Sequence, residues 1–99
     1  VVAANFGGNT DFTTEETAFL VDCELVDVDH DRPLTGIYKH VRKWAQPNID
    51  TAANHLRALY EDPAPGRRKA EAATAFITTC FAIENFENDV RRLIAEWPV

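Results

Sequence analysis

The sequence predicts an all-α fold: a four-helix bundle-like single domain with a long C-terminal helix and a flexible or extended N-terminal arm. Three observations favour this class. Apolar residues recur at helical spacing along most of the chain, helix start signals precede several of these segments, and nothing between Arg67 and Pro98 breaks a helix. We expect an arm over 1–12, which carries Gly-Gly and no helical period and also suits a short strand, and one helical domain over 13–99.

The first helix is expected over roughly residues 13–26. The stretch 13-TTEE-16 fits a capping box, in which a threonine hydroxyl and a glutamate bond reciprocally to free backbone amides. Helical spacing then continues through Phe19, Cys23 and Val26. A strand is the alternative, because 21-VDCEL-25 also alternates apolar and acidic residues.

Two shorter helices are expected next. Pro33 suits a first helical position, and Pro47 would end that helix, with Asn48 or Asp50 capping the following one. The apolar stripe of the earlier helix would be Ile37, Val41 and Trp44, and that of the later one Ile49, Ala53, Leu56 and Tyr60. The stretch 62-DPAPG-66 predicts a loop.

The last helix is expected to be the central and most buried one. It would run from Arg67 to near Pro98, and its apolar residues step by four and three like a coiled-coil seam with one acid in it. The seam consists of Phe76, Cys80, Ile83, Glu87, Val90, Ile94 and Trp97. A straight helix of about thirty residues spans roughly 45 Å, more than a small domain needs. It should therefore bend near Asn85 or project its end toward another chain.

Composition excludes several classes of function. The chain is 45% hydrophobic and 26% charged, as in an ordinary globular protein, and has neither serine nor methionine. Its longest uncharged run, residues 72–83, is shorter than the roughly twenty residues that cross a bilayer. Cys23 and Cys80 lie in apolar surroundings, which favours buried free thiols over a disulfide. Free thiols in turn favour a cytoplasmic location.

The net charge of −6 is unevenly distributed. Residues 1–31 hold eight acids and no lysine or arginine, whereas residues 32–69 hold eight bases against three acids. Either the two segments lie close together and their fields partly cancel, or one of them faces outward and steers a partner of opposite charge.

Asp27, Asp29 and Asp31 alternate along the chain as the first ligands of a calcium loop do. The glycine and the glutamate that complete an EF-hand loop are missing, because Arg32 and Tyr38 stand at those positions. Solvated acids before a helix are the preferred interpretation. The three histidines, His30, His40 and His55, lack the spacing of zinc or di-iron ligands. We therefore expect no metal, no cofactor and no catalytic residue.

Two basic features suggest other ligands. Arg67, Arg68 and Lys69 lie at a helix start, where cations oppose the helix dipole, so they could bind an anion or be compensated by nearby acids. The pair of helices within 37–62 also looks loosely like a helix-turn-helix, which makes a nucleic-acid-binding protein the alternative function. The net negative charge disfavours that alternative.

A limited resemblance concerns the small acidic immunity proteins that inhibit colicin-type nucleases. The stretch 11-DFTTEETAFL-20 is similar to the start of their first helix, and 36-GIYKHVRKW-44 resembles their last helix. The two stretches cover under a fifth of the chain. The acidic helix and tyrosine pair by which that family grips its nuclease have no match here.

The sequence as a whole favours a non-enzymatic protein–protein interaction module, either a small acidic inhibitor of the immunity type or a helical subunit of an assembly. Its partner would be another protein chain, in a homo- or hetero-oligomer, rather than a membrane. The expected anchors are Val90, Leu93, Ile94 and Trp97. The acids expected to steer a basic partner include Asp22, Glu24, Asp27, Asp29 and Asp31.

Overall fold

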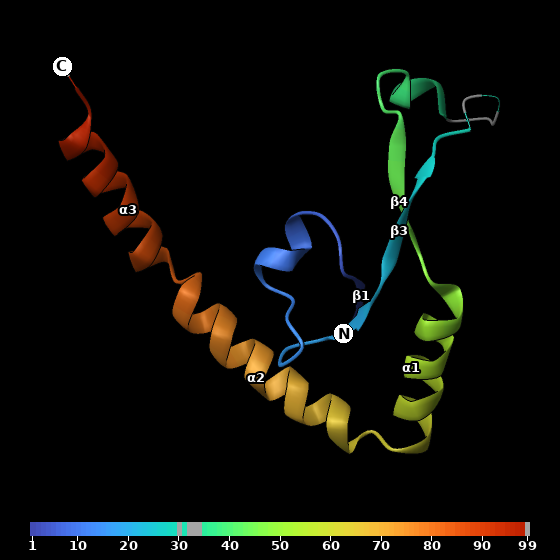
Figure 1. Cartoon of the computed structure of the whole chain (residues 1–99). Coiled ribbons are helices and arrows are strands. Elements are labelled where there is room, and N and C mark those ends of the chain that lie inside the picture. Colours follow the sequence, from blue (N-terminus) through green and yellow to red (C-terminus); the bar gives the residue numbers. More distant parts are fainter. Residues whose placement is uncertain (30, 32–34, 99) are drawn as a thin grey trace.

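The computed structural model describes residues 1–29, 31 and 35–98, and within them the fold is mixed α/β (Figure 1). The all-α prediction, with its four-helix bundle, is therefore wrong. The elements in chain order are β1 (Val2–Ala4), η1 (Gly8–Asp11), β2 (Phe19–Val21), β3 (Cys23–Asp27), η2 (Thr35–Tyr38), β4 (Lys43–Pro47), α1 (Ile49–Glu61), α2 (Ala64–Cys80) and α3 (Ile83–Glu96), where η1 and η2 are 3-10 helices.

The N-terminal residues form a strand rather than a free arm. β1 pairs in parallel with β2, with Val2 opposite Phe19 and Ala4 opposite Val21. The pairing continues one residue further, where the Asn5 amide donates to the Val21 carbonyl at 2.8 Å. Two of the buried apolar residues lie here, Val21 in β2 and Ala18 just before it.

That connection, residues 13–17, is a threonine turn and not the start of a helix. The Thr17 hydroxyl accepts from the Thr14 amide at 2.8 Å, and the Thr13 hydroxyl donates to the Asn9 carbonyl at 2.7 Å. Threonine hydroxyls that bond nearby backbone groups compete with helix formation. The expected helix over 13–26 is therefore absent, and its second half forms β2 and β3.

β3 and β4 form an antiparallel hairpin in which Cys23 pairs with Pro47 and Asp27 with Lys43. Pro33, the expected start of the second helix, lies outside the described residues. Thr35–Tyr38, expected in that helix, form η2, and the residues expected to end it form β4. The Tyr38 ring packs edge-on against Trp44, with ring centroids 6.0 Å apart. The apolar residues with helical spacing in this segment therefore belong to different elements, Ile37 to η2 and Trp44 to β4.

α1 starts where the sequence predicts. Asn48 is its N-cap, and the Asn48 side chain accepts from the Thr51 amide at 3.0 Å. One face packs on the first sheet: the His55 ring lies 5.5 Å from that of Phe19, and His55 Nε2 is 3.0 Å from the Leu20 carbonyl oxygen. The loop that follows is shorter than expected, because α2 already begins at Ala64.

The expected long helix is divided in two. α2 ends at Cys80, Ala82 has an extended backbone with φ −61° and ψ 145°, and α3 then runs to Glu96. In these two helices, all of whose residues are described, no side chain is buried. The expectation that the last helix is the most buried element is therefore wrong. Figure 1 shows α2 and α3 following one another in an arm that leads away from the sheets.

The molecule is open rather than compact. Its radius of gyration is 18.5 Å, against about 13 Å for a compact domain of this length. Its accessible surface of 8155 Å² is about 2,500 Å² larger than the area expected of a compact monomer of this mass. Among the described residues, the buried apolar core consists of Ala18, Val21 and Val28.

Candidate functional site

The clearest apolar feature of the surface is on α3, where Val90, Leu93, Ile94 and Trp97 line an open groove of about 430 Å³. We call these four residues the α3 seam. Leu93 is 58% exposed and Trp97 is 72% exposed. They are the residues that the sequence suggests as anchors for a partner. Large apolar side chains gathered on one exposed helix face are typical of a surface that binds another protein.

Nothing local accounts for the stability of α3. Its N-cap residue, Ala82, provides no side-chain hydrogen bond. An ion pair of 3.3 Å joins Arg92 and Asp89, both exposed, and such pairs contribute only about 0.3–0.5 kcal/mol. A helix of 14 residues is marginal in water unless its apolar face is packed. The apolar face of α3 is therefore without the packing that usually stabilises a helix of this length.

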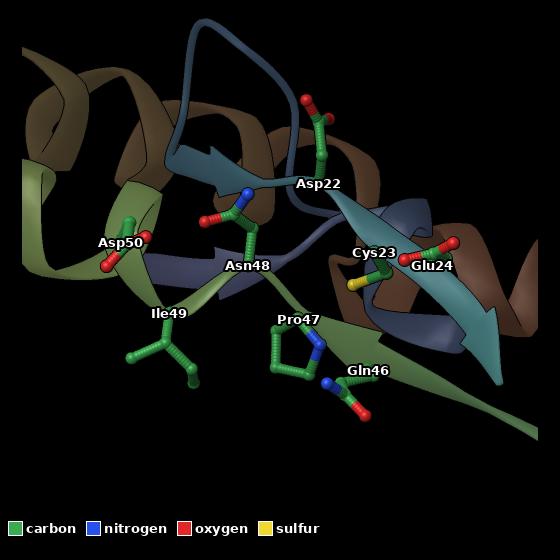
Figure 2. A pocket seen from close by; sticks show the side chains of 8 residues that line it. All are labelled: Asp22, Cys23, Glu24, Gln46, Pro47, Asn48, Ile49 and Asp50. Carbon is green, nitrogen blue, oxygen red and sulfur yellow. The ribbon is translucent and has the colours of Figure 1, made fainter.

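A second hollow, of about 350 Å³, lies where β3, β4 and the start of α1 meet. Its acidic lining residues are Asp22, Glu24 and Asp50. Figure 2 shows that these three carboxylates point in different directions and do not converge on one point. The backbone amide of Asn48 donates to the backbone carbonyl of Asp22 at 2.9 Å. This hollow is a junction between elements rather than a built ligand site.

The remaining acids proposed for steering are Asp27, the last residue of β3, and Asp29 and Asp31, which follow that strand. Asp27 forms an ion pair of 3.4 Å with Lys43, which stands opposite it in the hairpin. The Asp31 amide donates to Asp29 Oδ1 at 3.1 Å. The β3–β4 hairpin lies apart from α3 (Figure 1). That these acids steer a basic partner stays a prediction. The pairing of β3 with β4 does bring one acid, Asp27, next to a base, Lys43.

The basic cluster is partly used within the chain. Lys69 reaches the Glu15 carbonyl, and its Nζ lies 5.0 Å from the centre of the Phe19 ring. Arg67 and Arg68 are exposed. Lys69 thus ties α2 to the β1–β2 region, which gives it a structural role.

The residues with metal-binding or redox potential are dispersed. In the described part of the chain, no three His, Cys, Asp or Glu side chains are grouped closely enough to hold a metal ion. His30 lies outside the described residues, and His40 is exposed. Cys23 and Cys80 are free thiols, and Cys80 is exposed rather than buried.

The structure also removes the basis of two other interpretations. The first helix of the suggested helix-turn-helix is replaced by η2 and β4. Both stretches that resemble immunity-protein helices are non-helical as well, apart from short 3-10 turns. Among the described residues, no helix has the length and apolar composition of a membrane span.

Comparisons with protein-family models, curated proteins and solved structures gave no significant match.

One surface that the sequence does not single out for binding lies on α1. Ile49, Leu56 and Tyr60 belong to the apolar stripe predicted for this helix, and they are exposed, with Leu56 60% and Tyr60 91% exposed. We call these three residues the α1 outer face. Their helical spacing was a correct sign of an amphipathic helix. That spacing does not reveal whether the covering partner belongs to the same chain.

Proposed function

We propose that this protein is a non-enzymatic protein–protein interaction module, a subunit of an assembly in which another polypeptide covers the α3 seam. The exposed seam on a helix that lacks internal packing carries this proposal. The excess surface of about 2,500 Å² supports it, because obligate interfaces bury a comparable area on each partner.

The charge of α3 favours a protein over a lipid surface as the partner. Helices that lie on membranes usually carry lysine and arginine on their polar face. α3 instead carries Glu84, Glu87, Asp89 and Glu96 against Arg91 and Arg92. Anionic lipid would therefore be repelled by the net charge of this helix.

The test is the native mass of the protein purified from its source, with and without Leu93→Asp. We expect wild type in a complex heavier than the 11.1 kDa chain, and at least about 30-fold weaker association in the variant, because a charge would replace a central anchor. Leu93 is exposed, so β1, β2 and α1 should keep their fold.

Asn88→Asp is the matched control. It adds the same charge to the same helix, but about 140° around the axis from Leu93, and should leave the complex intact. A wild-type protein that runs at 11.1 kDa, or a Leu93→Asp variant that stays in the complex, would refute the proposal.

A further inference from the structure

The molecule carries two unpartnered apolar helix faces, the α3 seam and the α1 outer face. The helices that carry them are of similar length, 13 residues in α1 and 14 in α3. Each presents large side chains at helical spacing, as helix-on-helix packing requires. The two faces are therefore suited to each other in size and chemistry.

Within one chain these faces are held apart. α2 lies between them and, with 17 residues, spans about 25 Å. Figure 1 shows α1 on one side of the molecule and α3 at the far end of the arm on the other. In this conformation the seam of a chain does not reach its own α1 outer face.

The joint between α2 and α3 is held by specific contacts. The Phe81 ring packs edge-on against Phe76 and against Phe12, with ring centroids 6.1 and 6.5 Å apart. Asn85 Nδ2 crosses the joint and donates to the Thr79 carbonyl at 2.6 Å. These contacts fix the direction in which α3 leaves the molecule, so the extended arm is a defined conformation.

We infer that two copies of this chain exchange arms, so that the α3 seam of each copy packs on the α1 outer face of the other. A second copy brings a surface of equal size. Obligate homodimers bury from about 1,000 Å² on each chain, which is well within the excess surface of about 2,500 Å² that each copy exposes. Exchange of an identical element between protomers is a low-cost route to such dimers.

Reciprocal exchange accounts for both faces at once. Pairing of α3 with α3 alone would leave the α1 outer face in water, whereas exchange covers both faces and closes after two chains. The inference rests on the proposed function and specifies its partner.

The experiment uses the full chain, purified alone, and measures mass by light scattering. Wild type should have twice the 11.1 kDa chain mass. Leu56→Asp and Leu93→Asp should each give a monomer. An equimolar mixture of the two variants should recover a dimer, because the unaltered α1 outer face of one variant meets the unaltered seam of the other.

The milder pair Leu56→Ala and Leu93→Ala serves if an aspartate variant misfolds. Each should raise the dimer Kd at least about 30-fold, and the far-ultraviolet circular dichroism of the chain should lose no more than the signal of the 14 residues of α3. Asn88→Asp, on the other side of α3, should leave the dimer unchanged.

Three results would overturn the inference. A wild-type monomer would exclude a second copy, and if the protein from its source were still in a larger complex, the proposed function would stand with a different partner. A dimer that survives Leu56→Asp but not Leu93→Asp would indicate pairing of α3 with α3. Masses that keep growing with concentration would indicate head-to-tail association instead of a closed exchange.

Discussion

Around the threonine turn, small and β-branched side chains are buried and their polar groups are bonded, whereas α3 exposes larger apolar side chains along its length. Ala18 is fully buried, and the buried hydroxyl of Thr17 bonds the neighbouring backbone. In contrast, Leu93 and Trp97 are more than half exposed. The more amphipathic segment is thus the less packed one. Amphipathicity indicates that the apolar face of a helix packs against another surface, but it does not reveal which chain provides that surface.

The largest effect is expected in the packed region. Ala18→Asp would place an unpaired carboxylate at a position with no exposure, which should destabilise the fold by about 3–5 kcal/mol. Urea unfolding followed by circular dichroism measures this loss. Ala75→Asp, at an exposed position of α2, is the control and should cost no more than about 0.7 kcal/mol. Equal losses in the two variants would mean that the packed region is not the core.

The amides of α3 should be protected from hydrogen exchange only while the chain is associated with its partner. In the monomeric Leu93→Asp variant, the amides of α3 should exchange hydrogen at least about 30-fold faster than in wild type, while those of β2 and α1 stay nearly unchanged. Hydrogen exchange read by mass spectrometry resolves the two regions. Slow exchange throughout α3 in a proven monomer would show that the helix is stable without a partner.

The same contrast explains what the sequence could predict. The helix after Pro47 depends on neighbouring residues and was predicted correctly, and of the two residues proposed as its cap, Asn48 and Asp50, the structure has Asn48. β1 pairs with β2 across fourteen intervening residues, and no local pattern reveals such a parallel pairing. Phe19, Cys23 and Val26 have helical spacing, yet β2 and β3 meet at Asp22, so the same spacing arises from two short strands.

The candidate site was predictable in its residues but not in its setting. Val90, Ile94 and Trp97 were identified from periodicity and Leu93 was named with them as an anchor. These four residues line the groove on α3. A bend near Asn85 was one of two outcomes expected from the length of the helix, and the break lies three residues earlier, at Ala82, where neither glycine nor proline marks it. Its cause is tertiary, since Phe81 turns toward Phe12, a residue distant in the chain.

A moderate effect is expected from the threonine turn. Thr17→Val keeps the shape of a buried side chain but removes the acceptor for the Thr14 amide, which should cost about 1–2 kcal/mol in urea unfolding. Thr74→Val removes a hydroxyl that donates to the Ala70 carbonyl at 2.9 Å on an exposed helix, and should cost less than about 0.5 kcal/mol. If Thr74→Val lowered the free energy of unfolding more than Thr17→Val, side-chain hydrogen bonds would not distinguish the threonine turn from the exposed helix α2.

The smallest effect is expected at the hairpin. The side chains of Asp27 and Lys43 are 86% and 55% exposed, so their ion pair is solvated and should contribute less than about 0.5 kcal/mol. A double-mutant cycle with Asp27→Asn and Lys43→Gln, measured by urea unfolding, isolates this coupling. Because the coupling of two charges rises when water is removed from around them, a value above about 1 kcal/mol would mean that another chain covers the hairpin as well. The interface would then extend beyond α1 and α3 to the β3–β4 sheet.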